Sequence, residues 1–127
     1  MKHHTVKHRF GHAIVRGICL IFSVVASRIA LANPYKITVL ATNISDYGGL
    51  GEWSFSALFE GETESVLFDT GFKSDTVFHN VVHLGVDLSK VEKVVLSHFH
   101  SDHTGGLLAL RDYFVEANPK ALSTVYV

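Results

Sequence analysis

The stretch LSHFHSDHTGG gathers three histidines and an aspartate directly after a short apolar segment. That segment predicts a strand at residues 93–97, so the cluster begins where a strand ends. Side chains two positions apart on an extended chain share a face, and His98 and His100 can therefore bind one metal ion. A continued strand would carry Asp102 and His103 away, because five extended residues cover about 17 Å. The backbone must therefore turn within the cluster.

The residues that follow permit such a turn. Thr104, Gly105 and Gly106 allow a sharp exit from the strand. A helix that begins there would bring Asp102 and His103 back to the pocket of the first two histidines.

Imidazole nitrogen and carboxylate oxygen are ligands that zinc accepts. We predict one or two divalent ions, with His98 and His100 on one. Asp102 and His103 would bind a second ion about 3.5–4 Å away. A water between two such ions would ionise near neutral pH and attack a carbonyl or phosphoryl centre, with Asp102 orienting it. The alternative is a solvated histidine-rich loop in which Asp102 caps a helix.

The rest of the sequence predicts an α/β fold, with helices packed on a sheet. Apolar residues recur at helical spacing in two segments: one ends at Gly85, which is predicted to cap the helix, and the other follows the glycine pair. Trp53 and Phe55 alternate with serines, which predicts core positions on a strand that pairs as a hairpin with the next one. The predicted strands are 35–43, 53–61, 65–71, 93–97 and 123–127. The first predicted helix spans 74–84, with Ser74 or Asp75 as its N-cap and with Val77, Phe78, Val81 and Val82 facing inward. The second spans 107–117, with Leu107, Leu110 and Phe114 facing inward.

The first 32 residues predict a secretory signal peptide. Four basic and no acidic residues in positions 1–16 precede the apolar run GICLIFSVVA, and Ala30 and Ala32 fit an A-x-A cleavage site. A membrane anchor is the rival interpretation, but ten apolar residues are about half of a spanning helix. We expect export to the periplasm or medium after cleavage at Ala32, with no membrane span left.

Removal of this leader changes the charge and the thiol content. The remaining chain keeps six basic residues against all twelve acidic ones, a formal charge near −6. Nucleic acid is therefore not an expected partner, whereas a small-molecule substrate is. The one cysteine, Cys19, lies in the leader, so disulfides and thiolate ligands are excluded from the mature chain.

The H-x-H-x-D-H pattern of HFHSDH, with TGGL after it and LFDTG before it, resembles the metallo-beta-lactamase superfamily. The run LGVDLSKVEKVVLSHFHSDHTGGL is most similar to a branch with dihydropteroate-synthase-like, pterin-related and lactonase-like members. The resemblance covers residues 35–127. It implies an αββα sandwich, of which residues 33–127 would form about the N-terminal αβ half.

The resemblance also implies a role for each matching residue. His98 and His100 match ligands of the first metal. Asp102 and His103 match ligands of the second, and Asp102 also steers the attacking water. Asp69 matches an aspartate that holds the metal loop from behind, a role that a carboxylate beside ligating histidines often has. The alternative for Asp69 is a plain Asp-Thr-Gly turn.

One departure from the family pattern concerns the remaining ligands. Members add a third histidine, a bridging aspartate and a final histidine far downstream, whereas 24 residues without a histidine follow His103 here. The later acids Asp112 and Glu116 are expected to be solvated. We therefore expect a truncated chain that needs the C-terminal half or an oligomer partner to complete the site.

These observations predict an exported zinc-dependent hydrolase in which a metal-bound hydroxide attacks an ester, lactone, amide or phosphoester. Iron or manganese could replace zinc. Two alternatives stay open: a non-catalytic metal-binding fragment, and a di-iron redox member of the same fold.

Weaker candidates lie outside the cluster. His79 and His83 have the i, i+4 spacing that can bind zinc, but no third ligand is near in sequence, which favours an exposed helix face. Asp46, Glu52 and the pair Gly48–Gly49 could line a pocket mouth. A plain connecting loop is the favoured interpretation of that segment.

Overall fold

The computed structural model describes residues 34–127. The signal peptide predicted at residues 1–32, with Cys19 and the cleavage site, lies outside the described residues. Within residues 34–127, no helix is long and apolar enough to cross a membrane.

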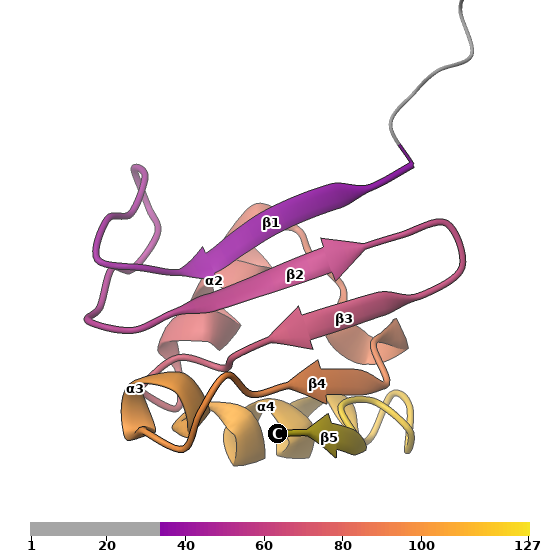
Figure 1. The fold of residues 1–127 in the computed structure, drawn as a ribbon. Helices are drawn as coiled ribbons and strands as arrows, with labels where there is room; N and C mark the ends of the chain where they lie inside the picture. The colour runs from indigo at the N-terminus through magenta and orange to yellow at the C-terminus, as the bar shows by residue number, and fades with distance from the viewer. Residues whose placement is uncertain (1–33) are drawn as a thin grey trace, which may run out of the picture. The chain divides into compact units, whose positions relative to one another are not determined.

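The described residues form a five-stranded mixed sheet with helices on one of its faces (Figure 1). The strands follow the order of the sequence: β1 pairs with β2 and β2 with β3 in antiparallel fashion, and β3 with β4 and β4 with β5 in parallel fashion. The predicted α/β fold is confirmed. The strands are β1 (Lys36–Ala41), β2 (Ser56–Glu60), β3 (Ser65–Phe68), β4 (Lys93–Val95) and β5 (Thr124–Tyr126).

Each parallel pair is joined by helical structure, as parallel connections require. The helix between β3 and β4 ends at Gly85, whose φ of 65° is the left-handed conformation that glycine adopts freely. The helical elements are α2 (Thr76–Leu84), the 3₁₀ turn η1 (Leu88–Lys90), α3 (Ser101–Thr104) and α4 (Leu107–Phe114).

The core lies between the sheet and the helices α2 and α4, which both lie behind the sheet in Figure 1. Val77 and Val81 of α2 and Leu110 and Phe114 of α4 are buried there, as predicted. Val82 was predicted to point inward but is 62% exposed. The inward position belongs instead to Asn80, which donates to the backbone oxygens of residues 40 and 50 and accepts from the amide of residue 50.

The prediction for the start of β2 was partly wrong. Residues 52–54 form a turn, with the Ser54 amide 2.8 Å from the Glu52 oxygen, and the strand begins at Ser56. Trp53 is consequently 78% exposed, and Phe55 is only half-buried. Alternation of polar and apolar residues cannot distinguish a strand from a turn that lies just before it.

The opposite face of the sheet is apolar. Among residues 34–127 no helix or strand covers it (Figure 1). Ile37, Val39, Phe59 and Tyr126 share this face by register and are each at least 40% exposed. A face of this kind normally packs against a second layer.

Two loops meet at one edge of the sheet because β3 and β4 are parallel and in register. The loop after β3 begins at Asp69, whose amide donates to the Val95 oxygen at 2.9 Å. The loop after β4 continues into α3. Hydrogen bonds connect the loops further: the Thr70 amide donates to the His103 oxygen at 2.7 Å and the Gly105 amide to the Gly71 oxygen at 2.9 Å.

The glycine pair has a different role from the predicted one. Gly105 and Gly106 have ordinary helical φ angles of −65° and −81°, and the turn is made earlier, by α3 itself. Both glycines instead permit close packing of the two loops. A Cβ on Gly105 would lie 2.0 Å from the Phe72 oxygen, and one on Gly106 would lie 2.1 Å from the Thr70 oxygen.

Glu52 holds the loop after β3 in place. Its carboxylate is buried and accepts hydrogen bonds from the amides of Phe72 (2.7 Å) and Lys73 (3.2 Å) and from the Ser54 hydroxyl (2.6 Å). Burial raises the pKa of Glu52, but the hydrogen bonds of Ser54, Phe72, Thr76 and Lys73 outweigh it, and the net pKa is lowered. Glu52 is thus a structural anchor and not the pocket-mouth residue that the sequence left open.

We expect Gly106→Ala to destabilise the fold by about 1–3 kcal/mol, because the added Cβ must push the two loops apart. The matched control is Gly85→Ala, where a Cβ meets no atom within 4 Å and the cost comes from the positive φ alone. Thermal unfolding measures both costs. Amide chemical shifts at Thr70 and Gly105 should move only in Gly106→Ala, and equal shifts in both variants would contradict the close-packing role.

The lowered pKa of Glu52 predicts a pH-dependent part of the stability. Ionised Glu52 stabilises the fold above the pKa of an unfolded glutamate, and this stabilisation is lost as the pH falls through the lower pKa of the folded state. Urea unfolding from pH 7 to pH 3 should therefore show a weaker pH dependence in Glu52→Gln than in the wild type. The exposed Glu116→Gln should keep the wild-type dependence; identical curves for Glu52→Gln and wild type would disprove the anchor role.

Candidate metal centre

The turn predicted within the histidine cluster is the short helix α3. His100 is its N-cap, with an extended φ of −69° and ψ of 147°, and Asp102 lies in its first turn. The His103 and Thr104 amides donate to the His100 oxygen at 3.0 and 3.2 Å, which closes the turn. The chain therefore reverses at Ser101, four residues before the glycine pair, and brings both halves of the cluster together.

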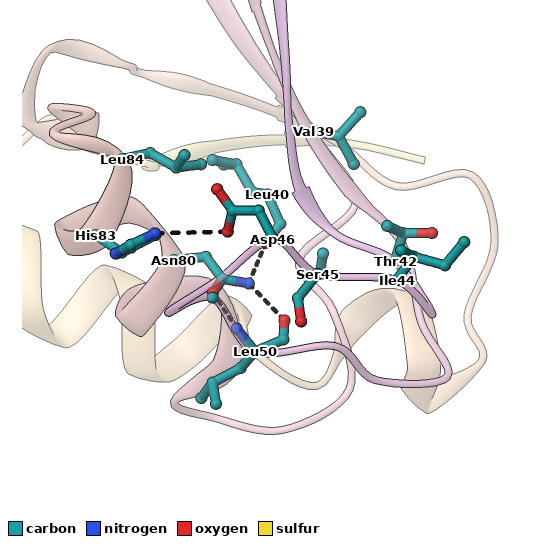
Figure 2. A pocket seen from close by; sticks show the side chains of 12 residues that line it. Val39, Leu40, Thr42, Ile44, Ser45, Asp46, Leu50, Asn80, His83 and Leu84 are labelled. Carbon is teal, nitrogen blue, oxygen red and sulfur yellow. Dashed lines mark hydrogen bonds and ion pairs between the residues drawn. The ribbon is translucent and has the colours of Figure 1, made fainter.

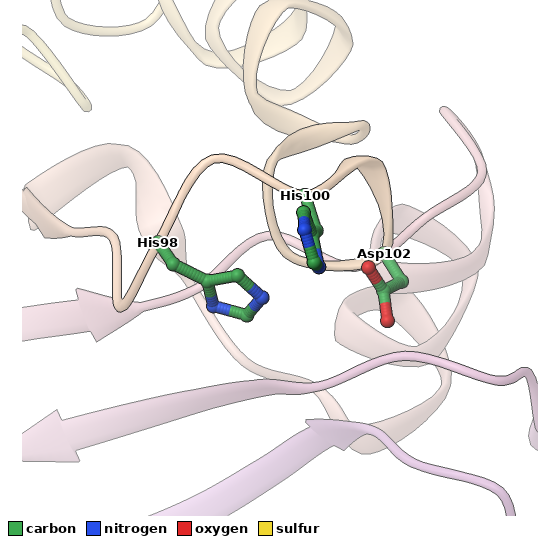
Figure 3. Close-up of side chains that lie close together, drawn as sticks. All are labelled: His98, His100 and Asp102. Carbon is green, nitrogen blue, oxygen red and sulfur yellow. The ribbon is translucent and has the colours of Figure 1, made fainter.

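Three of the predicted ligands converge on one point (Figure 3). One ligand atom each of His98, His100 and Asp102 lies within 4.8 Å of the others. The ring of His98 is 4.6 Å from that of His100 and 4.2 Å from that of His103, measured between centroids. His103 Nε2 lies 3.6 Å from an Asp102 oxygen. All four predicted side chains thus form one cluster, and their division between two metal ions stays a prediction.

The cluster suits a divalent cation. It offers imidazole nitrogen and carboxylate oxygen, the ligand types of zinc and of iron or manganese. His98 and His100 are exposed and Asp102 and His103 half-buried, so a bound ion would keep open positions toward solvent. Open positions are typical of catalytic sites, whereas structural zinc sites are closed.

Asp69 lies behind the cluster and is 1% exposed. Its carboxylate oxygens are 2.6 Å from His103 Nδ1, 2.8 Å from the Ser97 amide and 2.8 Å from the Ser97 hydroxyl. The backbone of Asp69 has a φ of 52°, an uncommon conformation that aspartate tolerates better than most residues. The geometry fits the holding role that the resemblance implied and exceeds what a plain turn requires.

Ser97 is a further residue of the cluster that the sequence did not indicate. Its hydroxyl lies 2.9 Å from His98 Nδ1, besides its contact with Asp69. The available signal was its place between the buried strand end and the first histidine, where a hydroxyl can reach both. Serine is so common in loops that this position alone did not indicate a role.

The weaker candidates form a separate region. Asp46 is 3.5 Å from His83 Nε2, and His79 Nε2 is 2.9 Å from the Gly48 oxygen. Figure 2 shows Asp46, His83 and Asn80 beside a cleft of about 210 Å³ between α2 and the loop after β1. None of the four cluster residues lines that cleft. The two histidines thus contact this loop, and Asp46 lies away from the metal cluster.

The remaining acidic candidates lie where the sequence predicted. Asp112 and Glu116 are exposed on and just after α4. Within residues 34–127, the only group of three or more histidine, cysteine or acidic side chains with metal-ligand spacing is the one that contains His98.

Comparison with known proteins agrees with this geometry. The model of the metallo-beta-lactamase superfamily matches residues 54–119, which include β2 to α4 and the whole cluster. A curated relative from Methanocaldococcus jannaschii, 7,8-dihydropterin-6-methyl-4-(beta-D-ribofuranosyl)-aminobenzene-5'-phosphate synthase, is 34% identical over 91 residues. The match covers 65% of this chain, and the chain spans 30% of the relative's length.

Solved structures give the same picture. A metal-dependent hydrolase of the beta-lactamase superfamily is 44% identical, with a TM-score of 0.50 over 57% of this chain and 25% of the other. The short form of human tRNase Z is 22% identical, with a TM-score of 0.51 over 63% and 29% of the two chains, and this likeness shows the fold alone. The partial coverage fits an N-terminal half of the fold. The mixed sheet, the clustered histidines and the match over residues 54–119 establish that this chain belongs to the metallo-beta-lactamase superfamily.

Proposed function

We propose that this chain is the N-terminal, metal-binding part of an exported, zinc-dependent hydrolase that acts on an ester, lactone, amide or phosphoester. The observation that carries the proposal is the convergence of His98, His100 and Asp102 within 4.8 Å at an open edge of the sheet. The 44% identity to a metal-dependent hydrolase supports the reaction class.

The side chains of the cluster have separable roles in this proposal. His98 and His100 hold a divalent ion through ring nitrogens, and Asp102 and His103 provide the adjacent ligands. When bound, the metal polarises the scissile carbonyl or phosphoryl oxygen and acidifies water. The Asp102 carboxylate accepts a hydrogen bond from the attacking water and thereby orients it. Asp69 fixes His103 by accepting from Nδ1 at 2.6 Å.

The proposal includes a second layer over the open face of the sheet. Four described ligand side chains leave a dinuclear site incomplete, and the exposed face with Ile37, Val39 and Phe59 would be stabilised by burial. We propose that a C-terminal half of the sandwich or an oligomer partner covers this face and adds the remaining ligands. The chain spans only 25–30% of the length of the relatives named above, which supports the proposal that further ligands come from outside the described residues.

Two other functions remain as outcomes of the same experiments. Metal binding without turnover would favour a non-catalytic metal-binding fragment, and bound iron with visible absorption would favour a redox site. The curated relative is named a synthase, so a pterin-related phosphate ester belongs in the substrate panel beside simple esters, lactones, amides and phosphoesters.

The metal proposal predicts that His98→Ala weakens zinc binding more than the roughly 10–100-fold typical of residues that only support a ligand. His79→Ala is the matched control, because it removes an exposed histidine outside the cluster, whose ring contacts the Gly48 oxygen and the ring of His83. Isothermal titration with zinc measures both affinities, and the substrate panel measures turnover. Equal affinities for His98→Ala and His79→Ala would refute the site.

The export proposal predicts a mature N-terminus at Asn33. A bulky charged side chain at the cleavage position should block processing, because the peptidase site accepts small residues there. Expression of the full sequence with an export pathway, followed by intact-mass analysis, should show loss of residues 1–32 in the wild type and retention in Ala32→Arg. A secreted wild-type chain that still carries Met1 would contradict this expectation.

A further inference from the structure

We propose that Ser97 is a positioning residue that fixes the tautomer of His98, so that His98 Nε2 is left free to bind the metal. The effect on metal binding rests on the proposed function, whereas the tautomer of His98 follows from the hydrogen bonds within this chain. The Ser97 hydroxyl lies between the buried Asp69 carboxylate and the ring of His98, and it donates to Asp69 and accepts from His98.

The carboxylate of Asp69 accepts every hydrogen bond that it makes in this network. An ionised carboxylate only accepts hydrogen bonds. Asp69 Oδ1 accepts from the Ser97 amide at 2.8 Å, and Oδ2 lies 2.8 Å from the Ser97 hydroxyl and 2.6 Å from His103 Nδ1. Because Asp69 is 1% exposed, water has little access to these oxygens, and protein donors must satisfy them.

The Ser97 hydroxyl has a single hydrogen to donate. It is donated to Asp69 Oδ2, so the Ser97 oxygen can only accept toward His98 Nδ1 at 2.9 Å. His98 Nδ1 must therefore carry a proton. A neutral imidazole has one N–H, which leaves Nε2 of His98 with its lone pair free.

The same carboxylate fixes His103 directly. His103 Nδ1 donates to Asp69 Oδ2 at 2.6 Å, and the contact of Nδ1 with the Ser97 hydroxyl is longer, at 3.4 Å. Nε2 of His103 is thus also free, and it faces Asp102 at 3.6 Å. The buried carboxylate of Asp69 thus fixes the tautomer of two rings: that of His103 by direct contact and that of His98 through Ser97.

His100 provides an internal reference. Its ring contacts His98 at 4.6 Å between centroids, and among residues 34–127 no hydrogen bond holds either of its ring nitrogens. Nothing in the network selects a tautomer for His100. A change at Ser97 should therefore alter His98 and leave His100 and His103 as they are.

The test is long-range ¹H–¹⁵N NMR of the histidine rings in the full, metal-free chain at about pH 8, where free imidazole is neutral. In the wild type we expect His98 and His103 with the proton on Nδ1. In Ser97→Ala we expect His98 to gain the Nε2–H form while His103 keeps its proton on Nδ1. Ser97→Thr retains a hydroxyl and should restore the wild-type pattern at His98.

Zinc titration adds a second readout. Ser97→Ala should bind zinc about 10–100-fold more weakly, and Ser97→Thr should recover most of the affinity. The unchanged His103 signal serves as the control for folding. If Ser97→Ala does not fold, the spectra of the wild type and Ser97→Thr still test the proposal, because both should show the His98 proton on Nδ1.

The proposal is overturned if His98 carries its proton on Nε2 in the wild type, or if Ser97→Ala leaves the His98 tautomer unchanged. A different result separates this inference from the proposed function. If the tautomers are as expected but the wild type binds no divalent metal, the metal function fails, and the positioning role of Ser97 in the ring network stands.

Discussion

The buried carboxylate of Asp69 is the interaction on which the arrangement of the cluster depends. A buried charge without partners costs several kcal/mol, so its hydrogen bonds to Ser97 and His103 constrain both residues strongly. The left-handed backbone at Asp69 adds a cost of about 1–3 kcal/mol, which the surrounding contacts must offset. The parallel pairing of β3 and β4 makes this possible, because it places the loop of Asp69 beside the loop of the histidines.

The two loops form a unit that is rigid behind the cluster and open in front of it. Backbone contacts at Gly105 and Gly106, together with Glu52 on the far side of the loop after β3, fix the frame. The ligand side chains His98 and His100 project into solvent from that frame. Such a combination suits a metal site that must hold its ligands in place and still admit a substrate.

Several features were predictable from the sequence because they depend on local periodicity. The strands, the two longer helices and their buried residues Val77, Leu110 and Phe114 follow from alternation and helical spacing. The errors occurred where distant contacts decide. Val82 points outward because Asn80, bonded to a loop 30 residues away, occupies the inward face. Trp53 is exposed because the Glu52 carboxylate turns the chain toward residues 72–73.

The sequence by itself determined the donor set of the cluster, because the types and spacing of His98, His100, Asp102 and His103 are chemical information that needs no fold. It also determined the α/β class. Only the tertiary structure decided that α3 makes the turn, that the glycines serve close packing, and that Ser97 joins Asp69 to His98. The physical reason for the last two features is that they arise from contacts between the loops that follow β3 and β4. Ser97 and Asp69, for example, are 28 residues apart in sequence, and no local pattern encodes such contacts.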